Sequence, residues 1–187
     1  MRSDLELSAL ASHTMSRRVW LRTAGTLAVG AGLAGRHPGA HAASLDVGRP
    51  APSLVLQTLD GRSIATEALR GHVVILTFWA TWCGPCHQEL PLLSEYAAKH
   101  AHQGLRVLGF SLDEPASLPA VREMTAGLSF PVGLLGSAYA GGYGRIWRIP
   151  VNFTIDRNGL LADNGWDSRE PAWTAERLER VVTPLLR

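Results

Sequence analysis

Residues 73–86 have the sequence VVILTFWATWCGPC, and this stretch decides the fold. Its first seven residues are aliphatic, β-branched or aromatic and carry no charge, which is typical of a strand buried on both faces. From Gly84 to His100, apolar residues recur at helical spacing, which predicts a long helix with a kink at Pro91. A buried strand that leads directly into a helix indicates an α/β domain with two cysteines at the junction.

The other segments from residue 43 onward alternate between strand and helix patterns. Residues 53–58 alternate apolar and polar side chains and meet Asp60-Gly61, which predicts a short β-hairpin. Further along we expect a strand at 105–112, a helix at 115–126, an extended piece at 130–135, a loose helix at 137–144, a strand at 151–155, an antiparallel return from Leu160 and a helix at 170–187. This order predicts a mixed central sheet flanked by helices, with an N-terminal β-hairpin extension.

The charge of the chain is concentrated in its first 42 residues. The 187 residues have a formal net charge of +2. Residues 1–42 contain five arginines against Asp4 and Glu6, which gives this segment +3 and leaves residues 43–187 at −1. A nucleic-acid-binding domain carries a basic patch on its folded surface. The sequence therefore predicts no nucleic-acid partner.

The N-terminal segment has the layout of an export signal. Arg17-Arg18 follows a serine, residues 23–35 are uncharged, and an A-x-A sequence ends at Ala42. The arginine pair resembles a twin-arginine signal. We expect residues 1–42 to be cleaved, leaving a periplasmic domain at 43–187. Two alternatives stay open: translation starting at Met15, and an uncleaved signal acting as a membrane anchor.

Cys83 and Cys86, the only cysteines, are separated by two residues at the start of the predicted helix. A helix N-terminus favours a negative charge, so it favours a thiolate there. We expect Cys83, at the exposed lip of the helix, to attack a disulfide. Cys86, one position into the helix and more buried, would resolve the mixed disulfide.

Other uses of the two cysteines fit the sequence less well. A purely structural disulfide across so short a loop would stabilise the fold little. A zinc site needs further ligands, which the histidines of this region do not offer in a recognisable pair. Residues 83–87 match C-x-x-C-H, the c-type haem attachment pattern, with His87 as the iron ligand. Their position between a buried strand and a helix argues against haem, and we expect no cofactor and no metal.

Residues 78–86, FWATWCGPC, resemble the active-site segment of the thioredoxin superfamily. Residues 86–91, CHQELP, resemble more narrowly the TlpA/ResA-like extracytoplasmic branch of that superfamily. The resemblance covers most of residues 47–186. It implies a thioredoxin fold, a redox-active disulfide between Cys83 and Cys86, and a loop with a cis-proline that faces this pair.

The resemblance extends to Pro150 and Ile149. Pro150 stands just before the strand at 151–155, where the family has its cis-proline. A cis bond there would place the backbone of Ile149 beside Cys83, where it can pair with a substrate strand. The alternative is an ordinary trans-proline at the start of a strand. Asn152 also begins an N-x-T glycosylation pattern, which we discount because it lies in this predicted strand.

Glu89 and Trp82 are the remaining candidate site residues. Glu89 matches the acidic residue of the TlpA/ResA-like branch, whereas thioredoxin itself has its buried acid at the position of Thr77. Any proton relay must therefore use Glu89; the alternative is a glutamate in the first helical turn that complements the helix dipole. Trp82 packs beside the thiols in relatives and is a candidate for substrate binding, or else an aromatic residue without a role.

These residues predict an exported thiol-disulfide oxidoreductase, and we favour a dithiol reductase of protein disulfides. The Gly-Pro spacer matches reducing relatives, and judging from the family the clients are apocytochrome c or copper-site proteins. A membrane thiol transporter of the DsbD/CcdA kind is the implied electron donor, and we favour a monomer. One alternative is a periplasmic oxidase or isomerase that uses the same residues. The other is a non-catalytic module that binds a client or a metal.

Overall fold

The computed structural model describes residues 45–187. The predicted export signal at 1–42, with its cleavage after Ala42, lies outside these residues. Within them, no helix is both long and apolar enough to cross a membrane. The described residues lie within the segment 43–187, which we expect to form the exported domain.

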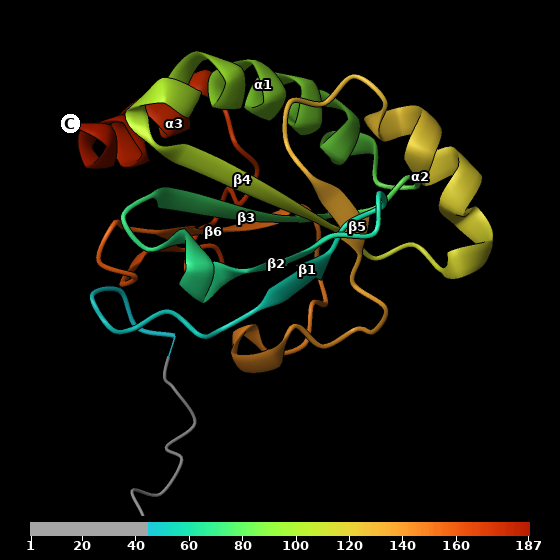
Figure 1. Ribbon diagram of the computed structural model, residues 1–187, viewed down its shortest axis with the longest axis horizontal. Helices are drawn as coiled ribbons and strands as arrows, with labels where there is room; N and C mark the ends of the chain where they lie inside the picture. The colour runs from blue at the N-terminus through green and yellow to red at the C-terminus, as the bar shows by residue number, and fades with distance from the viewer. Residues whose placement is uncertain (1–44) are drawn as a thin grey trace, which may run out of the picture. The chain divides into compact units, whose positions relative to one another are not determined.

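The centre of the fold is a five-stranded mixed sheet in the order β5-β4-β3-β6-β7 (Figure 1). β3, β4 and β5 run parallel to one another, whereas β6 is antiparallel to both β3 and β7. The strands are β3 (Val73–Trp79), β4 (Leu105–Ser111), β5 (Val132–Leu134), β6 (Val151–Ile155) and β7 (Leu161–Asn164). The predicted mixed sheet is confirmed.

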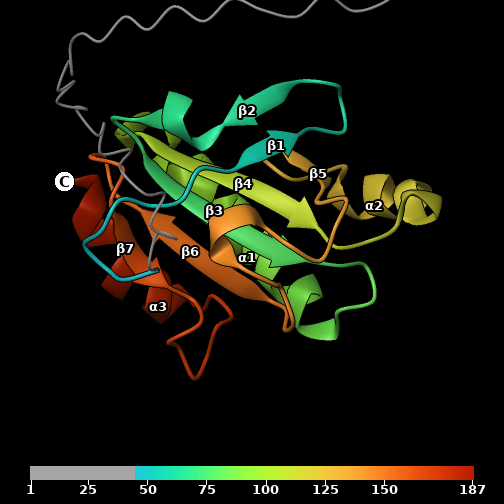
Figure 2. The same ribbon diagram turned by 90° about the horizontal axis from the view of Figure 1, so that it is seen from below.

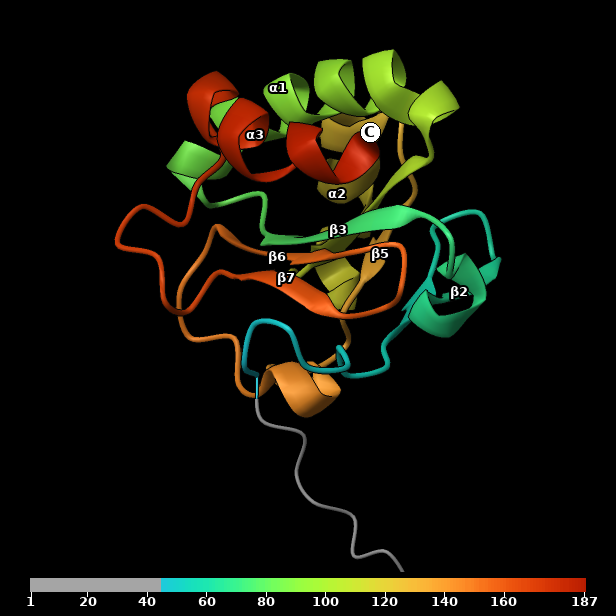
Figure 3. The ribbon, with the colours of Figure 1, turned by 90° about the vertical axis from the view of Figure 1, so that its left-hand side faces the viewer.

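Different elements cover the two faces of this sheet. The helices α1 (Gly84–His100) and α3 (Ala175–Val181) lie on one face (Figure 3), and α2 (Leu118–Thr125) flanks the β5 edge. The predicted hairpin, β1 (Val55–Gln57) with β2 (Ser63–Ala65), contributes to the opposite layer and lies beside β5 (Figure 2). This close approach requires glycine at position 133, because a Cβ there would lie 1.9 Å from the Gln57 carbonyl oxygen.

The β3 strand lies between two hydrophobic clusters, which explains its uncharged sequence. All seven of its residues are buried. Because side chains alternate across a strand, Ile75 and Trp79 pack toward the α1 side, and Leu76 and Phe78 pack toward the hairpin side. The strand therefore holds its C-terminal end, and the cysteine loop that follows it, in a fixed position.

Two predicted helices are shorter than expected. In place of a loose helix at 137–144 there is only a 3₁₀ turn at Gly141–Tyr143, because Gly141 and Gly144 have positive φ angles (54° and 81°) that an α-helix cannot accommodate. The helix predicted at 170–187 consists of α3 and a 3₁₀ turn at Thr183–Leu186. Residues 170–174 are instead a loop, which brings the backbone of Trp173 to the site described next.

Smaller differences concern the region between β3 and β5. The helix predicted at 115–126 is divided into a 3₁₀ turn at Pro115–Ser117 and α2, while the strand predicted at 105–112 ends at Ser111. The strand at 73–79, the helix at 84–100 and the strand at 151–155 match their predicted bounds. The helix continues through Pro91.

Candidate redox site

Cys83 and Cys86 are joined by a disulfide at the N-terminus of α1, as the resemblance implies. Cys83 is the N-cap residue, and its Sγ accepts a hydrogen bond from the backbone N–H of Cys86 at 3.3 Å. Pro85 lies in the first turn, where its missing N–H costs no helical hydrogen bond. The sulfurs thus lie where unpaired backbone N–H groups and the helix dipole stabilise negative charge.

The two sulfurs differ in their burial. Cys83 is 5% exposed and Cys86 is fully buried, so Cys83 is the outer cysteine, although it is less open than the sequence predicts. Cys86 is the third residue of the helix rather than the first, because α1 begins at Gly84. An incoming sulfur can therefore reach Cys83 more readily than Cys86.

The carboxylate of Glu89 lies in the core, one helical turn beyond Cys86, and is 2% exposed. It accepts a hydrogen bond from the backbone N–H of Trp173 at 2.6 Å and one from the Thr77 hydroxyl at 3.1 Å. The Asn152 side-chain amide lies 3.1 Å from both carboxylate oxygens. Glu89 is thus a buried core residue, and it lies beyond the first turn of α1, the turn in which the helix-dipole alternative placed it.

The surroundings of Glu89 shift its proton affinity. Burial raises its pKa from an ordinary value of 4.5 to about 7. Hydrogen bonds from Trp173, Asn152 and Thr77 and the positive charge of Arg177 oppose this rise without cancelling it. A carboxyl group with a pKa near 7 can give or take a proton at neutral pH.

Asn152 belongs to this site, although the sequence analysis did not assign it there. It is fully buried in β6, in register with Thr77 on β3, so both side chains reach the Glu89 carboxylate. Its side-chain amide also donates to the carbonyl oxygen of Pro171 at 2.9 Å. A fully buried amide cannot accept a glycan, which supports discounting the glycosylation pattern.

A buried arginine supports the loop that carries Trp173. The Arg177 guanidinium carbon lies 4.0 Å from the centroid of the Trp173 ring. The same guanidinium forms an ion pair with Asp163 of β7 at 2.7 Å, with both side chains largely buried. No local pattern reveals this group, because Trp173 lies 84 residues from Glu89 and Asp163 lies 14 residues from Arg177.

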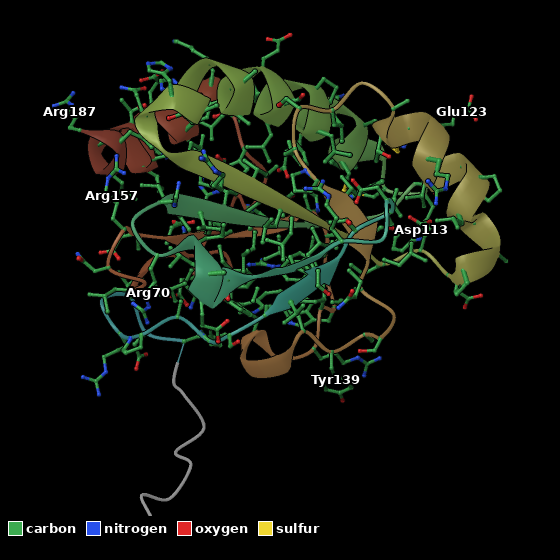
Figure 4. The ribbon with its side chains drawn as sticks, in the orientation of Figure 1. Arg70, Asp113, Glu123, Tyr139, Arg157 and Arg187 are labelled. Atoms are coloured by element: carbon green, nitrogen blue, oxygen red, sulfur yellow. A yellow bond between two sulfur atoms is a disulfide. The ribbon has the colours of Figure 1, made fainter. Side chains whose placement is uncertain are left out.

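Asp113 anchors the other side of the cysteine loop. It follows β4 in the chain (Figure 4), and its carboxylate accepts hydrogen bonds from the Thr81 backbone N–H at 2.8 Å and hydroxyl at 2.6 Å. The Ser111 hydroxyl donates to the same carboxylate at 2.6 Å. His87 Nε2 lies 2.7 Å from the Thr81 carbonyl oxygen. Asp113 and His87 thus engage three groups of Thr81, which lies two residues before Cys83: its N–H, its hydroxyl and its carbonyl oxygen. No sequence motif marks Asp113 for this role.

The remaining predicted site residues lie on loops. The Ile149–Pro150 bond is cis, as expected, so the trans alternative is wrong. Ile149 is half-buried and packs against both hydrophobic clusters, one of which contains Cys83 and Cys86. Trp82 is 69% exposed, so it is not a core aromatic.

The described residues contain no group of three or more histidine, cysteine or acidic side chains that could hold a metal ion. The sulfurs of Cys83 and Cys86 are bonded to each other. The arrangement has the parts for two-electron disulfide exchange: an outer and an inner sulfur, and a carboxyl group that can exchange a proton near neutral pH.

Comparisons with known proteins agree with this chemistry. Residues 47–163 match the model of the AhpC/TSA family. The thiol-disulfide oxidoreductase ResA of Bacillus thuringiensis is 32% identical over 120 residues, which cover 64% of this chain and 69% of that protein. Among solved structures, a Chlorobium tepidum protein assigned as thiol:disulfide interchange protein DsbE is 30% identical, with a TM-score of 0.65 over 77% of this chain and 100% of that one. A thioredoxin-family thiol:disulfide interchange protein from Chlorobium tepidum TLS is 29% identical, with a TM-score of 0.62 over 74% and 97% of the two chains.

Proposed function

This chain belongs to the AhpC/TSA family and is a thiol-disulfide oxidoreductase of the thioredoxin fold, and from that premise we propose that it is an exported dithiol reductase of protein disulfides. One observation carries the proposal: Cys83 and Cys86 form a disulfide at the N-terminus of α1, with Cys83 as the outer sulfur and the buried Glu89 carboxyl group one turn beyond the inner one.

The first step takes place at Cys83. Its thiolate, stabilised by the N-terminus of α1, attacks one sulfur of a client disulfide. A bond forms between Cys83 and that sulfur while the client's own S–S bond breaks. The departing client sulfur takes the electron pair and then a proton, which leaves a mixed disulfide between Cys83 and the client.

The second step uses Cys86 and Glu89. Glu89 in its ionised form accepts the proton of the Cys86 thiol, and the resulting thiolate attacks Cys83. The Cys83–Cys86 bond forms while the bond between Cys83 and the client sulfur breaks, and that client sulfur leaves as a thiolate that is then protonated. Two electrons pass to the client, and the protein ends in the disulfide form.

Two loop residues bind the client in this proposal. The backbone of Ile149, which directly precedes Pro150, pairs with an extended client segment as an added strand. Trp82, exposed beside Cys83, provides an apolar contact for the same segment. Catalysis therefore rests on Cys83, Cys86, Glu89 and Pro150, with Ile149 and Trp82 holding the substrate.

The proposed setting is the periplasm. Residues 1–42 act as a twin-arginine-type export signal, and residues 43–187 form the working domain as a monomer. A glutathione pool does not supply reducing electrons there, so a membrane thiol transporter of the DsbD/CcdA kind reduces the Cys83–Cys86 disulfide after each cycle. Apocytochrome c and copper-site proteins are the proposed clients.

Trapping tests this function, and a measured reduction potential tests its direction. Cys86→Ser removes the resolving thiol, so we expect a stable mixed disulfide between Cys83 and a client, visible by non-reducing electrophoresis. Cys83→Ser is the matched control and should trap nothing and lose insulin reduction. A Cys83→Ser variant that still reduces insulin would disprove the mechanism. A measured potential well above about −200 mV would favour the oxidase or isomerase alternative.

A further inference from the structure

Trp82 is one wall of a cleft of about 310 Å³ beside the cysteine loop. The other walls come from the loop after β4, at 112–115, and from the loop after β5, at 136–138. Because Trp82 directly precedes Cys83, a client side chain in this cleft would lie close to the disulfide being attacked. The position is suited to selecting clients by the residues that flank their cysteines.

The cleft carries negative charge and no positive charge. Its eight lining residues include Asp113 and Glu114 but no lysine, arginine or histidine. The Asp113 carboxylate is engaged by Thr81 and Ser111, whereas Glu114 is exposed. Across residues 45–187, the Glu114 carboxylate enters neither ion pair nor any side-chain hydrogen bond. It is available to a partner from outside.

Trp82 differs from another tryptophan of equal exposure. Trp147 is also 69% exposed, but its ring stacks on Trp166 at 5.5 Å and has the Arg148 guanidinium 5.2 Å from its centroid. Within the described part of the chain, Trp82 has neither an aromatic partner nor a cation. The protein thus pairs other tryptophans with its own arginines and leaves the face of Trp82 open.

An open indole beside a free carboxylate fits a cationic side chain. The indole face attracts a guanidinium or ammonium group, and the carboxylate forms a charge-assisted hydrogen bond with it. We propose that the Trp82–Glu114 cleft is a specificity subsite for a lysine or arginine next to the client cysteine. This inference rests on the proposed function, because the client must present a disulfide to Cys83.

Two synthetic peptides test the subsite. Each contains one intramolecular disulfide, and they differ only in having lysine or glutamate next to the first cysteine. Prereduced protein is mixed with each peptide in a single turnover, in which two electrons and two protons pass from the Cys83/Cys86 dithiol to the peptide disulfide. We expect the lysine peptide to react about tenfold faster at low salt, which corresponds to about 1.4 kcal/mol, and this ratio to fall toward one as salt rises.

Charge reversal identifies the residue responsible. In Glu114→Lys the preference should invert toward the glutamate peptide, and in Trp82→Leu it should shrink. Glu123→Lys is the matched control, because Glu123 is exposed on α2 (Figure 4). Glu123 does not line the cleft, so this variant should keep the wild-type ratio.

The outcomes separate the subsite from the function on which it rests. Equal rates for the two peptides, or the same ratio in Glu114→Lys as in the wild type, would overturn the subsite alone. If the prereduced wild-type protein reduces neither peptide and also fails to reduce the uncharged disulfide of 2-mercaptoethanol, the proposed function is overturned. The subsite proposal then fails with it.

Discussion

Two buried carboxylates, Glu89 and Asp113, lie on either side of the cysteine loop and have different surroundings. Glu89 has partners from three separate parts of the chain: β3, β6 and the loop before α3. The side-chain partners of Asp113 are Thr81, in the loop itself, and the nearby Ser111. We therefore propose different roles for them: proton transfer for Glu89, whose pKa burial brings to about 7, and positioning of the loop for Asp113.

Replacing Glu89 tests the proton-transfer half of this comparison and carries the largest expected effect. Glu89→Gln keeps the shape but cannot accept a proton, so resolution of the mixed disulfide should slow about 100-fold. The wild-type rate of this step should rise with pH through about 7, as Glu89 ionises, and the variant should lose that rise. Rapid-quench kinetics from pH 5 to 9 measure both; an unchanged pH profile would contradict the role of Glu89.

The same substitution changes how stability depends on pH. The pKa of Glu89 is higher in the folded protein, about 7, than its ordinary value of 4.5, so the folded state holds a proton that the unfolded chain releases between these values. Wild-type stability should therefore fall by about 3 kcal/mol between pH 4.5 and 7 from this group alone. Urea denaturation at a series of pH values should show a smaller fall for Glu89→Gln.

Replacing Asp113 tests the other half of the comparison. Asp113→Ala leaves the Thr81 N–H and two hydroxyls without their acceptor, which should lower the free energy of unfolding by about 1–3 kcal/mol. Attack by Cys83 should slow because its loop is less well held, while the rise in resolution rate near pH 7 should persist. Asp167→Ala, at an exposed site, is the control. If the resolution rate of Asp113→Ala no longer rose near pH 7, the assignment of proton transfer to Glu89 rather than Asp113 would be contradicted.

Removing one hydrogen bond to Glu89 should have the smallest effect. Thr77→Val is close in shape and deletes the 3.1 Å bond from the Thr77 hydroxyl, which lowers the pKa of Glu89. The pKa should therefore rise in the variant, and the midpoint of the pH profile should move upward by less than about one unit, since such a bond contributes about 1 kcal/mol. A downward shift in the same kinetic assay would contradict this account of the site.

The sequence by itself determined the features that depend on neighbouring residues. The uncharged run at 73–79 and the helical periodicity of 84–100 predicted β3 and α1 with their bounds, because burial on two faces leaves a local pattern. The same local order placed Cys83 and Cys86 at the helix N-terminus. The positive φ angles of Gly141 and Gly144 prevent the helix expected at 137–144, and these angles depend on the conformation of the whole loop.

Only the tertiary structure decided how Glu89 is surrounded. Asn152 and Trp173 lie 63 and 84 residues away in the chain, and no periodicity connects residues that meet only when β6 and the loop before α3 pack against α1. The pKa of Glu89 follows from that packing, because desolvation acts through atoms that are close in space, whatever their distance in sequence. The pattern of residues thus identified the sulfur chemistry, while the packing of distant segments set the proton affinity beside it.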